Sequence, residues 1–321
     1  MLRAKVDVHS RVTVFQPHAL QAAVKAGCVD AVAVLLPAID ATKEAGGAGL
    51  LVRATNDAVS CGQTAVLTQL LDAKADLADV NIAHAAYRGH DTMVAKLLGA
   101  KVSPNGTTTM SALALAAGEG HATIVAALLA AKATAGLFDE RGPTALVATA
   151  HHCKNKKNAF NILEQLIGAK ADVNVRGTLP NIGGTGVAVH LVARRKEAKL
   201  MSLLLDAKAT VETNFAVASA IGNNWTKGLK ILLDAKVSAN GAPDTGELPL
   251  PLQVAMYARA LSDRQKLSAV RVLVKAKADP QTVSRSPHFP LSPLAQAERS
   301  GASMRAILKV LQQAVVDDAN K

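Results

Sequence analysis

The triplet His151-His152-Cys153 is the densest group of metal-capable side chains in the sequence. Neighbouring residues on a helix point about 100° apart, so they rarely bind one ion without further ligands. A metal-dependent enzyme stays open as a hypothesis that metal analysis of the purified protein would test. The sequence contains no GxSxG, GxxxxGK, GxGxxG or HExxH motif. We therefore predict a protein that is not an enzyme and uses no metal or cofactor.

The composition indicates what kind of core must hold any site. Half of the 321 residues are apolar, but the aromatic ones number only five Phe, two Tyr and one Trp. The core must therefore be built from Ala, Leu, Val and Ile. Small side chains let helices approach closely, which favours stacked short helices over a wide β-sandwich.

The sequence predicts an intracellular protein that does not insert into a membrane. No apolar run approaches the roughly 18–20 residues of a membrane helix, and residues 1–8 hold no apolar segment of signal-peptide length. Cys28, Cys61 and Cys153 lie far apart, which favours free thiols in a reducing compartment. We expect the cytoplasm or nucleus, with an organelle left open. Cys28 and Cys61 lie beside Gly on apolar helices, so we expect both to be buried.

A short phrase recurs along the chain, in which a Leu-Leu-like pair precedes the letters xAK. From Leu35 to Leu273 the pair appears eight times at a mean interval of 34 residues. This period suits either of two helical repeat families, the ankyrin and the tetratricopeptide repeats, so the motif inside the repeat must decide.

That motif resembles the ankyrin repeat. Residues 111–129 read SALALAAGEGHATIVAALL, similar to the ankyrin consensus TPLHxAAxxGHxxIVxxLL, and residues 139–146 read DERGPTAL, similar to its DxxGxTPL entry. The resemblance covers roughly residues 18–312. It implies an all-α repeat solenoid, in which ankyrin helix-turn-helix repeats are joined by β-hairpin-like loops. Gly is expected to end each first helix, because it enters the left-handed region cheaply.

The repeat count predicts the domain organisation. We expect residues 1–321 to form a single ankyrin-repeat solenoid of about eight to nine repeats. Residues 1–17 would be a partial N-terminal repeat tail, and residues 292–321 a C-terminal capping repeat. The chain could also be a fragment of a longer array.

Charge is placed periodically. The net charge of +11 would fall to +3 without eight lysines that share one repeat position, where ankyrins usually have Gly. Each is expected just past a second helix, where a cation complements the helix dipole by about 0.3–1 kcal/mol. Either this structural role or a binding surface for an acidic partner explains the basic ladder, which consists of Lys5, Lys74, Lys101, Lys132, Lys170, Lys208, Lys236 and Lys277.

The ankyrin resemblance also implies which residues contact a partner. The ends of the first helices face the concave groove and carry Lys25, Tyr87, Arg88, Glu119, His151, His152, Arg194, Arg195, Tyr257 and Arg299. The hairpin tips are the other contact site of the family, and one tip carries Phe138, Glu140 and Arg141. Tyr and Arg are enriched in interface hot spots, although surface helix residues are often charged for no such reason.

Two functions follow, neither of them catalytic. The first is a protein–protein interaction scaffold or adaptor that binds an acidic partner through its concave groove. It would have no small-molecule substrate. The sequence fits a fixed subunit of a large assembly as well as it fits a free adaptor. The alternative is association with nucleic acid or a ribonucleoprotein through the lysine ladder. The scarcity of aromatic residues argues against single-strand stacking and leaves backbone electrostatics.

Overall fold

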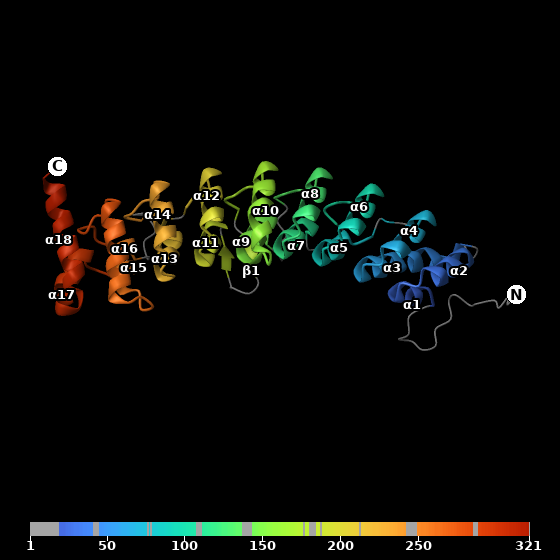
Figure 1. The fold of residues 1–321 in the computed structure, drawn as a ribbon, viewed down its shortest axis with the longest axis horizontal. Helices are drawn as coiled ribbons and strands as arrows, with labels where there is room; N and C mark the ends of the chain where they lie inside the picture. The colour runs from blue at the N-terminus through green and yellow to red at the C-terminus, as the bar shows by residue number, and fades with distance from the viewer. Residues whose placement is uncertain are drawn as a thin grey trace. The chain divides into compact units, whose positions relative to one another are not determined.

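The computed structural model of the chain describes residues 19–40, 45–75, 77, 79–106, 111–136, 143–175, 177–179, 184–186, 188–211, 213–241, 249–284 and 288–320. The chain divides into two compact units. Unit 1 comprises Met1–Asp172 and Gly177–Thr185, and unit 2 comprises Val173–Arg176 and Gly186–Lys321. All the longer elements of both units are helices (Figure 1), as the repeat pattern predicts.

Unit 1 consists of consecutive helix pairs, and each pair has a first and a second helix. The first helices are α1 (Ala19–Ala26), α3 (Ala45–Cys61), α5 (Ile82–Arg88), α7 (Ala112–Glu119) and α9 (Ala145–His152). The second helices are α2 (Val29–Asp40), α4 (Thr64–Asp72), α6 (Asp91–Gly99), α8 (Ala122–Ala130) and α10 (Lys156–Gly168). Each first helix packs on the next first helix and each second helix on the next second helix, which produces two layers. Two short strands, β1 (Gly177–Leu179) and β2 (Gly184–Gly186), pair as a hairpin-like connection.

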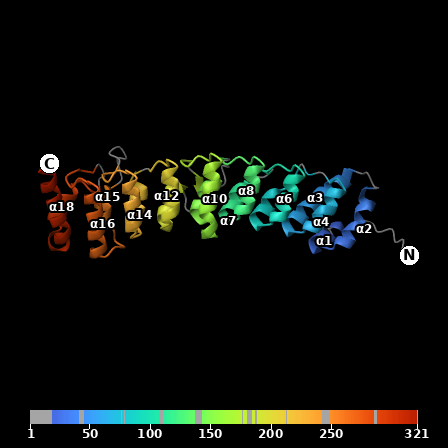
Figure 2. The ribbon, with the colours of Figure 1, turned by 45° about the horizontal axis from the view of Figure 1, so that its top comes forward.

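Unit 2 repeats the arrangement with four pairs. Its first helices are α11 (Ala188–Arg195), α13 (Thr213–Gly222), α15 (Pro251–Tyr257) and α17 (Pro293–Arg299). Its second helices are α12 (Ala198–Asp206), α14 (Thr226–Asp234), α16 (Asp263–Lys275) and α18 (Arg305–Ala319), the last preceded by the 3₁₀ turn η1 (Gly301–Met304). Figure 2 shows the second helices of each unit following one another in chain order.

The helix ends have local chemical causes. Ser111 and Thr144 cap α7 and α9, because their hydroxyls accept hydrogen bonds from the backbone N–H groups of Ala114 and Val147. At its C-terminal end, α5 stops at Gly89, whose φ of 76° lies in the left-handed region. The expected role of Gly at the end of a first helix is thus confirmed at this repeat.

The core is aliphatic, as the composition requires. In α7 the buried residues are Ala112, Leu113, Ala114, Ala116, Ala117 and Gly118, and their small size allows close approach to α5 and α9. The Leu that opens the recurring pair is buried in seven of the eight copies, for example Leu70, Leu97 and Leu128, and is half-buried in the first copy, Leu35. Trp225 is the one buried aromatic residue among the described ones, and it packs against Gly228 at the start of α14.

Candidate partner-binding surfaces

The lysine ladder occupies one backbone position with an unusual conformation. In every described copy the last residue of the second helix is followed by Ala and then by the ladder lysine. All seven lysines are exposed and have a positive φ between 54° and 65°, namely Lys74, Lys101, Lys132, Lys170, Lys208, Lys236 and Lys277. The expected place just past the second helix is confirmed, and Lys5 lies outside the described residues.

These lysines sit in a Schellman turn. The N–H of Lys132 donates to the carbonyl of Leu129 at 2.9 Å, and the N–H of Ala133 donates to the carbonyl of Leu128 at 2.9 Å. The same two bonds recur at all seven ladder positions, so the phrase LLxAK encodes this helix stop. A left-handed conformation costs a residue with a Cβ about 1–2 kcal/mol, which Gly avoids. Lysine is therefore not the residue that the turn itself favours.

Asparagine side chains tie three of the ladder turns to the next repeat. In three copies an Asn lies four residues after the ladder lysine, and its side-chain oxygen accepts from the backbone N–H two residues after the following lysine. The acceptors and donors are Asn105 and Thr134 at 2.9 Å, Asn174 and Thr210 at 2.6 Å, and Asn240 and Asp279 at 2.6 Å. Both residues of each pair lie within one unit, so each bond joins two loops of that unit.

In unit 1, two of the residues predicted for partner contact take part in ion pairs. Lys25 at the end of α1 lies 3.5 Å from a carboxylate oxygen of Asp57 on α3. Glu119 at the end of α7 lies 2.7 Å from the Nζ of Lys154, which follows α9. This contact with Glu119 raises the pKa of Lys154 above its ordinary value. The positive charge expected along this row is thus partly neutralised.

Tyr87 stands beside that ion pair. Its side chain is 42% exposed, and the Nζ of Lys154 lies 5.9 Å from the ring centroid, within reach of a weak cation–π attraction. A ring nitrogen of His121 lies 3.2 Å from the carbonyl oxygen of Tyr87. The end of α5 therefore presents an aromatic ring that its neighbours α7 and α9 help to hold. Arg88, the next residue, is exposed.

In unit 2, aromatic rings accompany the basic residues. The Tyr257 ring at the end of α15 lies 5.5 Å from the ring of Phe289, and Tyr257 is 38% exposed. Phe215 on α13 is 53% exposed, and its ring lies 5.6 Å from that of His190 on α11. Both pairs belong to the first-helix layer or to the segment that leads into it.

The remaining predicted contact residues fall into three groups. Arg194 and Arg299 are exposed at the ends of α11 and α17. Arg195 and His151 are half-buried. Phe138, Glu140 and Arg141 lie outside the described residues, as does the side chain of His152.

The structure adds three residues that sequence reasoning did not assign to a site. Lys154 lies outside the repeat motif, so no pattern marked it. Phe215 and Phe289 do not belong to the recurring LLxAK phrase, and only their rarity as aromatic residues could have drawn attention to them.

Neither a metal site nor a membrane helix is found in the described part of the chain. No group of three or more His, Cys, Asp or Glu residues is placed there to hold an ion. No helix among the described residues has both the length and the apolar character needed to cross a bilayer. The expectation that Cys28 and Cys61 are buried is wrong, because both are exposed, whereas Cys153 is buried.

Comparison with known proteins agrees with this architecture. Residues 82–177 match the family model described as ankyrin repeats (3 copies). The human ASB11 ankyrin repeat domain is 19% identical, with a TM-score of 0.53 over 71% of this chain and 96% of that one. An ankyrin repeat domain from Acinetobacter baumannii is 24% identical, with a TM-score of 0.50 over 63% of this chain and 96% of that one. No curated protein matches. The ankyrin resemblance and the all-α repeat fold are thus confirmed, and ankyrin repeats generally act as protein–protein interaction modules.

Proposed function

Because this chain carries ankyrin repeats, we propose that it is a non-catalytic scaffold or adaptor that binds an acidic protein partner through its first-helix layer. The observation that carries this proposal is the exposure of its few aromatic side chains. Of the described aromatic side chains that are more than a third exposed, Tyr87, Phe215 and Tyr257 belong to first helices at 38–53%, and Phe160 belongs to the second helix α10 at 37%. The core is filled with aliphatic residues. Full burial of a Phe side chain contributes about 1.5–3 kcal/mol, and these half-exposed rings forgo part of that, which a partner surface would recover.

The charge on this layer suits an acidic partner. Arg88 follows Tyr87 in unit 1 and is exposed, and Arg194 and Arg299 are exposed on first helices of unit 2, as Phe215 and Tyr257 are. Arginine combines charge with a planar group that binds carboxylates in two-point contacts. The layer therefore offers apolar anchors with cationic neighbours, a combination typical of interface hot spots.

Affinity purification of the native protein at low and at high salt, followed by mass spectrometry, tests the proposal. A stoichiometric partner that survives high salt supports a dedicated scaffold or complex subunit. Binding of that partner should weaken about ten-fold or more in Phe215→Ala/Tyr257→Ala and in Arg194→Glu/Arg195→Glu. Val316→Ala removes a 52% exposed side chain from the second-helix layer and serves as the control. Undiminished binding by both double variants would show that the first-helix layer is not the contact surface.

Nucleic-acid association is the second candidate, and the exposure of all seven described ladder lysines favours it. Such binding would involve the phosphate backbone and would fall steeply with salt. An electrophoretic shift assay at two salt concentrations, repeated with Lys208→Gln/Lys236→Gln/Lys277→Gln, separates it from the scaffold. Shifts that resist high salt or ignore the substitutions would exclude this mode.

A further inference from the structure

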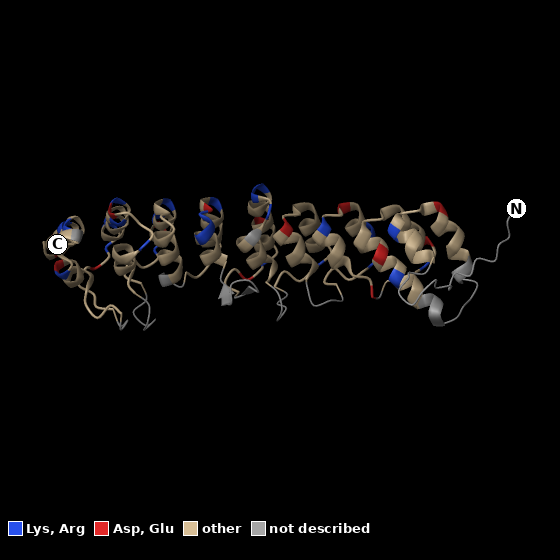
Figure 3. Cartoon of the chain, turned by 90° about the horizontal axis from the view of Figure 1, so that it is seen from below, with Lys and Arg blue, Asp and Glu red and all other residues tan. Residues whose placement is uncertain are grey.

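The second-helix layers of the two units differ in charge. The second helices of unit 2 carry nine Lys or Arg residues against five Asp. Those of unit 1 carry three Lys against five Asp or Glu. Figure 3 shows the blue residues gathered on the second helices of unit 2. This difference is separate from the ladder, whose lysines lie beyond the helix ends and occur in both units.

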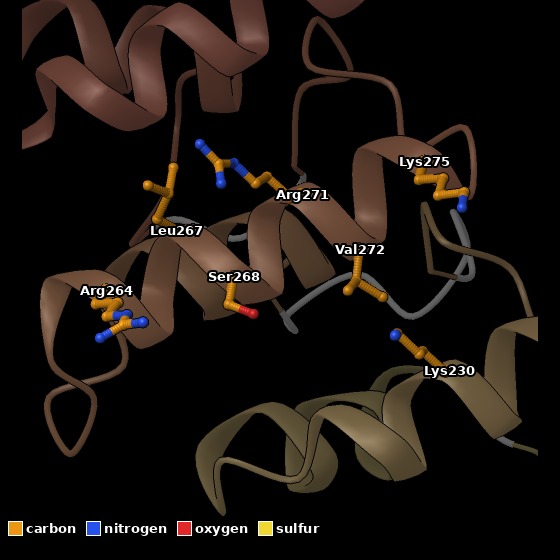
Figure 4. Close-up of a pocket in the computed structure, with 7 residues that line it drawn as sticks. All are labelled: Lys230, Arg264, Leu267, Ser268, Arg271, Val272 and Lys275. Carbon is orange, nitrogen blue, oxygen red and sulfur yellow. The ribbon is translucent and has the colours of Figure 1, made fainter.

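The basic residues of unit 2 surround a cleft between α14 and α16. The cleft has a volume of about 380 Å³ and is lined by Lys230 from α14 and by Arg264, Leu267, Ser268, Arg271, Val272 and Lys275 from α16. In Figure 4, Ser268 and Val272 point from α16 toward Lys230, and Arg264 and Lys275 stand near opposite ends of the helix face. The eleven helical steps from Arg264 to Lys275 correspond to roughly 16 Å of helix.

A second cleft lies on the other side of α16. Its volume is about 370 Å³, and Arg271 and Lys275 line it together with Lys309 and Val310 of α18. Arg271 and Lys275 therefore border both clefts, and α16 forms a ridge that exposes its cations to either side. A ligand on this face would meet the same two cations whichever cleft it entered.

Folding gains little from this arrangement. Asp234 lines the adjoining hollow between α14 and α16, and Asp317 lines the cleft beside α18. The ion pairs seen among the described residues nevertheless involve none of the four cations Lys230, Arg264, Arg271 and Lys275. Arg271 and Lys275 are four residues apart on one helix, a spacing at which like charges destabilise the helix. The cations thus lower stability locally, and an anionic ligand would remove that cost.

The aliphatic lining distinguishes between classes of anionic ligand. Leu267 and Val272 are half-buried in the first cleft, and Val274 and Val310 line the second. Nucleic acid would use aromatic platforms for bases or cations alone for phosphates, and it would leave these aliphatic groups unused. A peptide with both acidic and aliphatic side chains would contact the cations and the apolar groups together.

We propose that the second-helix face of unit 2, centred on α16, is a separate docking site for an acidic, aliphatic-containing segment of a protein partner. The site does not depend on the first-helix layer, since its residues come from the other helix layer. Carboxylates of the segment pair with Arg264, Arg271 and Lys275, and its aliphatic side chains cover Leu267 and Val272.

Selection of a random 12-residue peptide library displayed on phage against the full chain tests this site. We expect enriched peptides that combine Asp or Glu with Leu, Ile or Val, and synthetic copies should lose about ten-fold or more in affinity for Arg264→Glu/Arg271→Glu. The control is Lys156→Glu/Lys157→Glu, which makes the same charge change on α10 of unit 1 and should leave affinity unchanged. Arg264→Gln/Arg271→Gln gives a milder second variant if charge reversal disturbs folding, as checked by circular dichroism.

Three results would overturn the proposal. Enrichment of peptides without acidic residues would contradict the charge argument. Equal binding to the wild type and to both cleft variants, or no enrichment at all, would contradict the location. If the wild type bound a DNA or RNA duplex, and the cleft variants lost this binding but kept their affinity for the peptides, the face would be assigned to phosphate backbones instead. A different result would distinguish the two proposed surfaces. If the cleft variants lost peptide binding but still bound the partner identified by affinity purification, this site would be independent of the first-helix layer.

Discussion

Lys154 and Glu119 join two neighbouring repeats of unit 1 through a 2.7 Å ion pair beside the exposed ring of Tyr87. The backbone N–H of Lys154 also donates to the carbonyl of Gly118 at 3.2 Å, so the lysine is held at both ends. The hydrogen bond to Glu119 is the main reason that the pKa of Lys154 is raised. The pair therefore couples the shape of the Tyr87 surface to the packing of α7 and α9.

The raised pKa of Lys154 predicts a pH dependence of stability. Since the pKa is higher in the folded state, the contribution of the pair is fully present below the ordinary lysine pKa of about 10.4 and is lost as the pH rises through the folded-state pKa. Replacement of Lys154 by Met should lower the thermal midpoint slightly at pH 7, and this difference should vanish in strongly alkaline solution. Midpoints for both proteins between pH 7 and pH 11 check this. A difference that grows with pH would contradict the assigned sign.

The left-handed ladder lysines predict that glycine would stabilise the protein. Lys132→Gly should raise the free energy of unfolding by about 0.5–1 kcal/mol, because relief of the left-handed strain exceeds the added entropy of the unfolded chain. Lys132→Val should lower it, since a β-branched residue tolerates a positive φ poorly. Urea unfolding measures both changes.

The matched control for this ladder substitution is Lys96→Gly within α6. Glycine in a helix interior costs about 1 kcal/mol, so the same chemical change should here have the opposite sign. Equal effects at Lys96 and Lys132 would show that the backbone conformation at the ladder is not the cause.

The asparagine bridges predict a side-chain contribution to repeat stacking. Asn174→Ala removes the acceptor for the N–H and hydroxyl of Thr210, at 2.6 and 2.8 Å, and should cost about 1 kcal/mol of unfolding free energy in urea. Asn174→Asp keeps an acceptor oxygen and should recover most of this loss. If Asp failed to recover stability while Ala lost it, the bond to Thr210 would not be the origin of the effect.

The sequence predicted the features that depend on local pattern. The recurring LLxAK phrase placed each ladder lysine just past a second helix, because the period of the buried Leu determines where the helix must stop. It did not predict that Lys132 and its counterparts adopt a positive φ, since lysine has no intrinsic preference for that region. The two backbone bonds of the Schellman turn place the second residue after the helix in this conformation, as they do for each of the seven lysines.

Features that depend on contacts between repeats were harder to predict. Lys25 and Glu119 read as free surface charges in the sequence, but Asp57 and Lys154 approach them from the neighbouring repeats. Cys28 and Cys61 were expected to be buried because of their apolar neighbours, yet Cys28 lies between α1 and α2, Cys61 ends α3, and both are exposed. Sequence distance alone does not determine which groups meet across a repeat boundary.

Two glycines of unit 1 provide the last prediction, because they differ in backbone conformation and in surroundings. Gly89 ends α5 with a φ of 76°, and a Cβ there would lie 2.5 Å from the ring of His121, whereas a Cβ at Gly49 within α3 would meet nothing within 4 Å. Gly89→Ala should therefore lower the free energy of unfolding by about 1–2 kcal/mol and displace His121 from the carbonyl of Tyr87. Gly49→Ala should raise it by about 1 kcal/mol through helix propensity. Urea titrations measure the stabilities, and the NMR shifts of the His121 ring follow its displacement. A Gly89→Ala protein as stable as the wild type, with unchanged His121 shifts, would show that the turn after α5 tolerates a side chain.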